Sequence, residues 1–217
     1  METVEQIPVN IPVPVASNHS AEAAHAGPTD RELVERCQGG DFDAFEALVN
    51  RYRQRVYGLA YGMLRNEPDA VDLSQETFVK AWQAIRGFKK NASFYTWLYR
   101  ITTNLCIDLV RKRDRRPTVP LEEAEDLPAD AGVEVAPSNQ PLPTDEVRRR
   151  ELREQIDAAL LELSPEHRAV VQLREFEGLD YGQIAAAMGC SIGTVMSRLH
   201  YARKRLQKLL REAYEST

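Results

Sequence analysis

The 217-residue sequence has only three cysteines, Cys37, Cys106 and Cys190, which lie far apart and form no Cys-x-x-Cys pair. None of the four histidines has the spacing to a cysteine or to another histidine that a zinc site requires. A glycine-rich loop of the kind that cradles a phosphate is also missing. The sequence therefore predicts no disulfide framework, no metal and no cofactor, and it offers no constellation of catalytic residues for an enzyme.

Long hydrophobic runs are missing as well. No stretch approaches the roughly 18 apolar residues that a membrane span needs, and the acidic start of the chain is not followed by the apolar core of a signal peptide. We therefore expect a soluble cytoplasmic protein with no membrane insertion. Because 43% of the residues are hydrophobic, the chain has enough apolar side chains to build packed cores.

The net charge of −5 conceals an uneven distribution of charge along the chain. Residues 1–30 carry four acidic residues and no Lys or Arg, whereas residues 31–116 carry 16 basic and 11 acidic residues. Residues 117–144 contain six acidic residues and no basic one, and residues 145–217 contain 12 of each. A basic block and a neutral block joined by an acidic segment are typical of a polyanion-binding protein with an acidic connector.

Composition and periodicity divide the chain into four parts. Residues 1–29 are rich in proline and small residues and are predicted to form a disordered tail. Residues 30–116 and 144–214 show apolar residues at helical spacing, with no strand alternation. Residues 117–143 contain six prolines and no apolar periodicity, which predicts a flexible acidic linker. The predicted fold class is all-α, with two small helical domains joined by this linker, the second a helix-turn-helix domain.

Capping and breaking residues place the helices more closely. Asp41, Ser164 and Asp180 are expected to cap helices, as is Ser191, because their side chains accept hydrogen bonds from free backbone N–H groups. Pro68 is expected to open a helix that extends to about Ile85, and further helices are predicted at 30–37, from Ala92 to about Arg113 and from about Leu152. Gly189 is expected to end the helix that begins after Asp180.

The clearest local signal is LDYGQIAAAMGCSIGTVMSRLHYARKRL at 179–206, in which a short helix, a turn at Gly189 and a second helix have helix-turn-helix spacing. From Ser191 to Arg211 there are six basic residues and no acidic one, so the second helix can enter a major groove. Arg198 is suited to a bidentate guanine contact. The predicted DNA-binding residues of this helix are Thr194, Met196, Ser197, Arg198, Arg203 and Lys204. The alternative is a solvated basic face on a structural helix pair.

A second signal is GFKKNASFYTWLYRITTNLCIDLVRKRDRR at 87–116, where aromatic and basic residues alternate. Such a mixture suits single-stranded DNA, because bases stack on rings while cations follow the phosphates. Phe94 and Trp97 have core spacing and are predicted to pack inside, whereas Tyr95 and Tyr99 lie on another face and are expected to be more exposed. The loop 89–93 is polar and flexible enough to hold an extruded base.

A third signal is DAVDLSQETFVKAW at 69–82. Asp69, Asp72 and Glu76 have helical spacing on one face, with Gln75 nearby, which favours a partner-docking surface with an acidic component. The alternative is an ordinary amphipathic helix whose first acidic residues interact with the helix dipole.

Three motifs, DAVDLSQETFVKAW, SFYTWLYRITTNLCID and SIGTVMSRLHYARKRL, resemble in order and separation those of extracytoplasmic-function (ECF) sigma factors of the sigma-70 family. The likeness covers about residues 30–116 and 144–212. Helix-turn-helix repressors share only the last motif, so a stand-alone DNA-binding regulator would leave the first two without a role. A small all-helical enzyme is the third hypothesis, and the missing site residues argue against it.

The resemblance implies a sigma factor, which binds core RNA polymerase, directs initiation at promoters and catalyses nothing itself. Residues 69–82 would dock on the clamp helices of the largest subunit through Asp69, Asp72, Gln75 and Glu76. The helix-turn-helix would read the −35 element and pack on the polymerase flap. An anti-sigma factor is implied as a further partner. Met196 stands where the family commonly has Lys or Arg, so the −35 preference is expected to be unusual.

The resemblance also assigns the −10 element to the second signal. Loop 87–93 would capture a flipped base, Asn104 would lie near that base, and the basic run from Arg111 would hold the edge of the melted duplex. The residues implied in −10 binding are Lys89, Lys90, Asn91, Ser93, Tyr95, Arg100, Asn104, Arg111 and Arg113.

Overall fold

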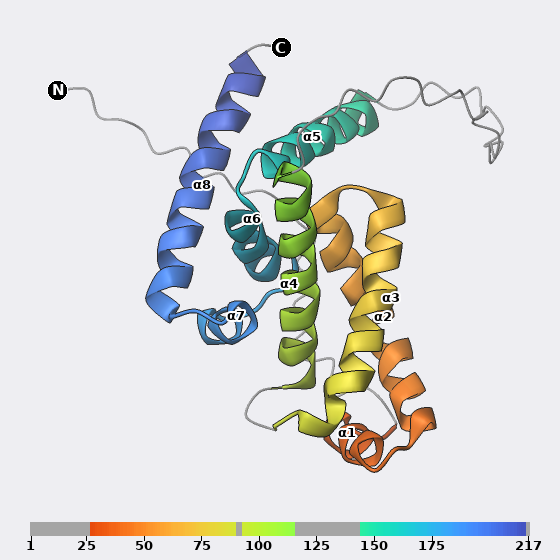
Figure 1. Ribbon diagram of the computed structural model, residues 1–217. Helices are drawn as coiled ribbons and strands as arrows, with labels where there is room; N and C mark the ends of the chain where they lie inside the picture. Colours follow the sequence, from red (N-terminus) through yellow and green to blue (C-terminus); the bar gives the residue numbers. More distant parts are fainter. Residues whose placement is uncertain (1–26, 90–92, 116–143, 216–217) are drawn as a thin grey trace, which may run out of the picture.

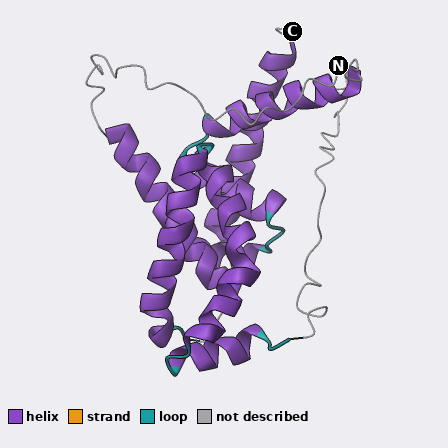
Figure 2. Ribbon diagram, turned by 90° about the vertical axis from the view of Figure 1, so that its right-hand side faces the viewer, coloured by secondary structure: helices purple, strands orange, loops and turns teal. Residues whose placement is uncertain are grey.

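The structure, a computed structural model, describes residues 27–89, 93–115 and 144–215. Within these ranges all regular elements are helices (Figure 2), which confirms the predicted all-α fold class. The predicted linker at 117–143 and all but the last three residues of the predicted tail lie outside the described residues. The same holds for Lys90 and Asn91 of the predicted base-capturing loop.

The helices form two halves that lie side by side (Figure 1). The first half consists of α1 (Asp30–Gln38), α2 (Phe42–Leu64), α3 (Glu67–Ala84), a 3-10 turn at Ile85–Gly87 and α4 (Phe94–Arg115). The second half consists of α5 (Thr144–Leu161), α6 (Pro165–Val171), a π-helical turn at Gln172–Phe176, α7 (Tyr181–Met188) and α8 (Ile192–Glu215).

Capping side chains set the helix ends at the predicted positions. The Asp41 carboxylate accepts from the backbone N–H of Ala44 at 3.1 Å, which satisfies one of the free donors at the start of α2. Asp180 forms a reciprocal capping box with Gln183 at the start of α7. Gly189 then ends α7 in the left-handed conformation, with φ 60° and ψ 37°, as predicted.

The first half is held by an aromatic and aliphatic core. Phe94 is buried, and its ring centroid lies 5.7 Å from that of Trp97, which in turn lies 4.9 Å from that of Phe88. The prediction that Phe94 and Trp97 are packing residues is therefore confirmed. Phe45, Leu48 and further apolar side chains of α1, α3 and α4 complete this cluster.

A second core is shared by the two halves. Helices α2, α3 and α4 contribute buried side chains to it, and α5, α6, α7 and α8 contribute others from the far end of the chain. Its members include Leu59, Met63, Tyr99, Cys106, Leu160, Val170, Leu173, Ile184, Val195 and Leu199. The sequence indicated two separate domains, and it did not predict that their apolar faces would pack on each other.

Polar side chains of the second half also reach the backbone of the first half through this core. Arg168 is buried and donates from Nη1 to the carbonyl of Met63 at 2.5 Å. Gln172, also buried, donates from Nε2 to the carbonyl of Gly62 at 3.1 Å. These bonds satisfy buried polar groups on both sides of the contact, so the shared core is specific rather than a loose apolar association.

Candidate nucleic-acid and partner interfaces

One face of α4 presents polar side chains along the length of the helix. Arg100, Asn104, Asp108, Arg111 and Arg115 recur three or four residues apart, and all five are exposed. Residues at this spacing lie above one another on a helix surface. Three of the residues predicted to bind the −10 element therefore lie on a single exposed stripe. A shallow hollow lined by Asp108, Arg111, Lys112 and Arg115 forms its basic end.

The other predicted −10 residues have different surroundings. Lys89 is exposed at the end of the described part of the loop. The Ser93 hydroxyl accepts from the backbone N–H of Thr96 at 3.3 Å, so this serine caps the start of α4. Arg113 forms a two-pronged ion pair with Asp69 on α3, with 2.6 Å between Nη1 and Oδ2. The structure thus pairs Arg113, which was predicted to bind the −10 element, with Asp69, which was predicted to contact the polymerase.

The two tyrosines of α4 do not lie on the exposed stripe. Tyr99 is only 2% exposed, and its hydroxyl donates to the Glu177 carboxylate in the second half. Tyr95 is half-buried, and its hydroxyl accepts from Nε2 of Gln183 at the start of α7. The prediction that these tyrosines are the better exposed aromatics of this helix is wrong for Tyr99 and holds only in part for Tyr95. The reason is that α7 packs against this face of α4.

Burial raises the pKa of Glu177 above its ordinary value, against the opposing effects of the Tyr99 hydroxyl and the Arg55 charge. A carboxyl group whose pKa is raised by folding destabilises the fold above its unfolded pKa of about 4.3. We predict that Glu177→Gln matches the wild type in stability near pH 4 and exceeds it at pH 7, because the amide carries no charge to bury. Urea melts of both proteins across this range measure the difference, and a constant difference would contradict the prediction.

The predicted docking surface on α3 is an exposed polar face. Asp72, Gln75 and Glu76 are all exposed, and Glu76 pairs with Lys80 one turn later at 3.3 Å. Asp69 differs from the other three residues, since its carboxylate is held by Arg113.

Exposed apolar side chains lie on the same helix, among them Val71, which the sequence had indicated as a poor choice for a water-facing position. Val71 is 40% exposed and Val79 is 55% exposed, and they share a face of α3 with Gln75 between them. Phe42 is 61% exposed at the start of α2, where its ring meets the edge of Trp82 at 5.3 Å between centroids. An apolar centre with charged residues beside it is the usual composition of a protein interface. The sequence prediction did not include Val79, and the spacing of eight residues between the two valines was the signal that could have added it to this surface.

The helix-turn-helix has the predicted elements. The Ser191 hydroxyl accepts from the backbone N–H of Thr194 at 3.1 Å and so caps α8. Met196 is 54% exposed and lines a shallow groove on the outer face of α8. That groove is lined by Tyr181, Met196, His200, Arg203, Lys204 and Gln207. Arg203 also pairs with Glu175 at 2.7 Å, which ties α8 to the π-helical turn at Gln172–Phe176.

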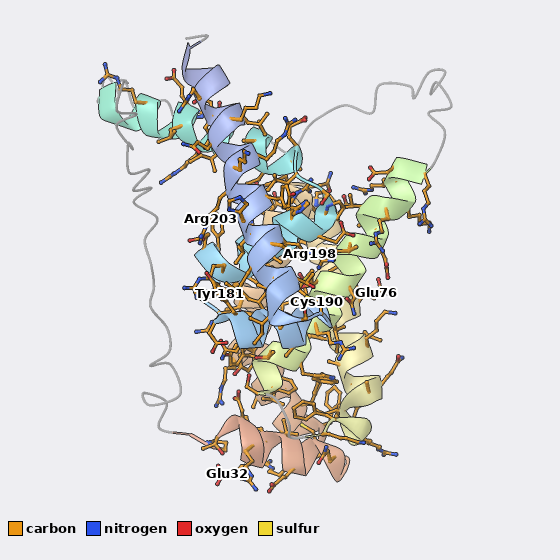
Figure 3. All side chains as sticks on the ribbon, turned by 90° about the vertical axis from the view of Figure 1, so that its left-hand side faces the viewer. Glu32, Glu76, Tyr181, Cys190, Arg198 and Arg203 are labelled. Carbon is orange, nitrogen blue, oxygen red and sulfur yellow. The ribbon has the colours of Figure 1, made fainter. Side chains whose placement is uncertain are left out.

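Arg198 lies away from this groove. It is half-buried and lies on the side of α8 that faces α4 (Figure 3). Glu166 at the start of α6 lies near it and forms an ion pair with Arg111 of α4. Burial alone would raise the pKa of Glu166, but its backbone hydrogen bond and the charges of Arg111 and Arg198 together hold that pKa below its ordinary value. One carboxylate is therefore paired with Arg111, a predicted −10 residue, and feels the charge of Arg198, the predicted −35 reader.

Two further observations concern the part of the chain that the structure describes. No group of three His, Cys, Asp or Glu side chains in it is placed to hold a metal ion. None of its helices combines the length and the apolar character needed to cross a membrane.

Comparison with known proteins agrees with this arrangement. Residues 48–116 match the family Sigma-70 region 2, and residues 153–206 match Sigma-70, region 4. The RNA polymerase sigma-H factor of Pseudomonas aeruginosa is 39% identical over 191 residues, which span 85% of this chain and 97% of the relative. The ECF RNA polymerase sigma-E factor of Escherichia coli is 37% identical over 190 residues, which span 84% of this chain and 97% of the relative.

Solved structures show the same fold. CnrH in complex with the cytosolic domain of CnrY is similar with a TM-score of 0.61 and 28% identity, over 84% of this chain and 97% of that one. The sigma factor RpoE of Bartonella quintana, solved with the anti-sigma factor NepR, is similar with a TM-score of 0.56 and 29% identity, over 77% of this chain and 96% of that one.

The helical fold and the two matched regions define a sigma factor of the sigma-70 family. The chain belongs to the ECF group within that family. As an ECF sigma factor it directs promoter-specific transcription, and its relatives are initiation factors rather than enzymes.

Proposed function

We propose that this sigma factor docks on the clamp helices of the largest polymerase subunit through α3, reads the −10 element with α4 and the loop before it, and reads the −35 element with α8. The observation that carries this proposal is the separation of surfaces by chemistry. The face of α3 combines exposed valines with acidic residues, whereas α4 and α8 present cations at helical spacing. An apolar and acidic surface suits a protein partner, and cationic helices suit a polyanion.

The domain assignment follows the same division. Residues 30–116 would form the domain for polymerase docking and −10 recognition, and residues 144–214 would form the −35 domain that also packs on the flap. Residues 117–143 would connect them, with carboxylates that mimic nucleic acid along the path of the exiting RNA. Residues 1–29 receive no role in this proposal.

Melting of the −10 region would use the exposed stripe of α4. Asn104 lies on this stripe with Arg100 one turn before it, and the Lys89 end of the loop lies at the start of the helix. A base extruded from the duplex needs a polar pocket and nearby cations for its flanking phosphates. The exposed amide of Asn104 and the guanidinium groups along the stripe supply these groups.

An anti-sigma factor is the proposed regulatory partner. The relative from Bartonella quintana was solved with the anti-sigma factor NepR, and CnrH was solved with the cytosolic domain of CnrY. Exposed large apolar residues of the second half, such as Leu161 and Tyr201, provide surface that such a partner could cover.

Reconstituted transcription tests the proposal directly. The purified chain is added to core RNA polymerase with genomic DNA as template, and the 5′ ends of the transcripts are mapped. Specific start sites that share −35 and −10 sequences are expected. A complete lack of specific transcripts would reject the proposal.

The docking surface gives a separate prediction. Reversing both charges in Asp72→Lys/Glu76→Lys should weaken binding to core polymerase by about tenfold or more, because an acidic docking surface binds through a complementary potential that the two lysines would reverse. The fold should be retained, since exposed substitutions usually change stability by no more than about 0.5 kcal/mol each. The matched control is Glu151→Lys/Glu154→Lys on the exposed face of α5. If the α3 variant binds core polymerase as tightly as this control, the docking assignment is wrong.

A further inference from the structure

Gln38, the last residue of α1, ties that helix to the chain that leads into the proposed base-capturing loop. Helix α1 lies across the end of the first half where α3 ends and α4 begins (Figure 1). The Gln38 side chain is half-buried, and its Nε2 donates to the carbonyl of Ile85 at 3.1 Å and to that of Phe88 at 2.9 Å. An amide NH2 group has two donor hydrogens, so it can make both bonds at once. These carbonyls belong to the loop stem, residues 85–88.

Helix α1 is itself fixed at both ends, so the Gln38 amide is held by a rigid element. At the start of α1, the Asp30 carboxylate accepts a hydrogen bond from the Tyr52 hydroxyl of α2. Near the end of α1, Arg36 pairs at 2.8 Å with Asp41, which caps α2. The buried side chains of α1 are Leu33, Val34 and Cys37. A supporting residue positions a functional loop well when it is carried on such a packed element.

The bonds from Gln38 fix the direction in which the chain leaves the loop stem. The Phe88 ring packs against Trp97 with 4.9 Å between centroids, and this apolar contact holds the residue but not the plane of its peptide group. The Phe88 carbonyl lies in the plane of the peptide bond to Lys89, and hydrogen bonds to a carbonyl are directional. Gln38 therefore orients the peptide group from which the exposed Lys89 continues into the loop.

We propose that Gln38 is a positioning residue for recognition of the −10 element. Through the carbonyls of Ile85 and Phe88 it sets the direction of the base-capturing loop, and with it the base that the loop accepts. Gln38 itself does not touch DNA in this role. Holding a loop in one conformation reduces the ordering cost of binding and keeps its polar groups at fixed positions relative to the base. The recognition role rests on the proposed function, whereas the anchoring of the loop stem does not.

Three variants distinguish the amide of Gln38 from the general stability of α1. Gln38→Met removes both donors, because methionine has a similar length and no N–H group. Gln54→Met is the matched control, since Gln54 is exposed on α2. Val34→Ala is the structural comparator. Val34 is only 2% exposed in α1, and its truncation weakens the packing of the helix without removing a donor.

The test measures the anchoring and the recognition separately. The backbone N–H of Phe88 donates to the Ile85 carbonyl at 3.1 Å inside the loop stem. Hydrogen exchange of the free full-length chain, followed by mass spectrometry of peptides that cover the stem, should be about fivefold faster or more in Gln38→Met than in the wild type and Gln54→Met. In promoter-library transcription with reconstituted holoenzyme, Gln38→Met should reduce the preference at one −10 position by about threefold or more. The −35 preference should stay unchanged, and Val34→Ala should leave both preferences as they are.

The outcomes separate anchoring from recognition. Unchanged exchange in Gln38→Met would overturn the anchoring, and faster exchange with an unchanged −10 preference would overturn the recognition role. An equal change of preference in Val34→Ala would make the effect a result of lost stability and would also overturn that role. If Gln38→Met does not fold, Gln38→Asn, whose amide is one methylene shorter and cannot reach both carbonyls, should shift both measurements in the same direction. If the wild-type holoenzyme lacks specific transcripts while the exchange difference persists, the proposed function and the recognition role fail and the anchoring stands.

Discussion

Replacing Arg168 with methionine should lower the free energy of unfolding by about 3–5 kcal/mol, because several buried carbonyl groups lose a charged donor at the same time. Arg168 is only 4% exposed. Its guanidinium donates to the carbonyls of Leu160 at 2.9 Å, Leu161 at 2.6 Å and Leu163 at 3.2 Å. Leu160 and Leu161 are the last two residues of α5 and Leu163 follows the helix, at a helix end where carbonyls lack the donors that a continuing helix would supply.

Methionine fills a similar volume but donates no hydrogen bond, so the α5 carbonyls and that of Met63 would lose this donor inside the protein. Urea unfolding followed by circular dichroism measures the loss. The control is Arg150→Met, because Arg150 is exposed and, among the side chains that the structure describes, pairs with Glu154 one turn away at 3.1 Å. The Arg150→Met substitution should lower the free energy of unfolding by no more than about 0.5 kcal/mol. A loss below about 1 kcal/mol for Arg168→Met would show that water replaces the guanidinium.

Replacing Arg198 with alanine should change which promoters the holoenzyme uses. If Arg198 contacts a base edge in the major groove, its loss should reduce the free energy of binding to the preferred promoter by about 1–3 kcal/mol. It should also relax the base preference at one position of the −35 element. Promoter-library transcription with reconstituted holoenzyme measures the base preference at each −35 position. A uniform loss of output with an unchanged −35 consensus would make Arg198 a phosphate-binding or structural residue.

Two neighbouring positions on α8 serve as controls for this experiment. Lys204 is exposed beside the outer groove and should contact phosphate. Lys204→Ala should therefore lower output about equally for all sequences and reduce the salt dependence of binding. Met196 can make only apolar contacts, for example with a thymine methyl group. Met196→Arg should therefore shift the preferred base at its own position toward guanine.

Local features of the structure followed from the sequence because they depend on residues close together in the chain. A capping side chain such as Asp41 or Asp180 bonds to a backbone N–H three residues later, so its effect needs no knowledge of the fold. The left-handed turn at Gly189 is equally local. Helical periodicity likewise separated packing residues such as Phe94 from polar ones such as Asn104 along a single helix.

The sequence by itself thus determined the helices, the ends that carry a capping side chain or Gly189, and the three motifs that place the chain among the ECF sigma factors, whereas the start of α5 lies at Thr144 and not near Leu152. Only the tertiary structure decided which apolar faces meet. An amphipathic stripe indicates that one face of a helix is covered, but it does not identify the element that covers that face. For this reason Tyr99, which has the sequence character of an exposed aromatic, is buried under α7. Arg168 and Gln172 are polar residues buried against the backbone of a helix more than 100 residues earlier in the chain, because that backbone offers acceptors inside the shared core.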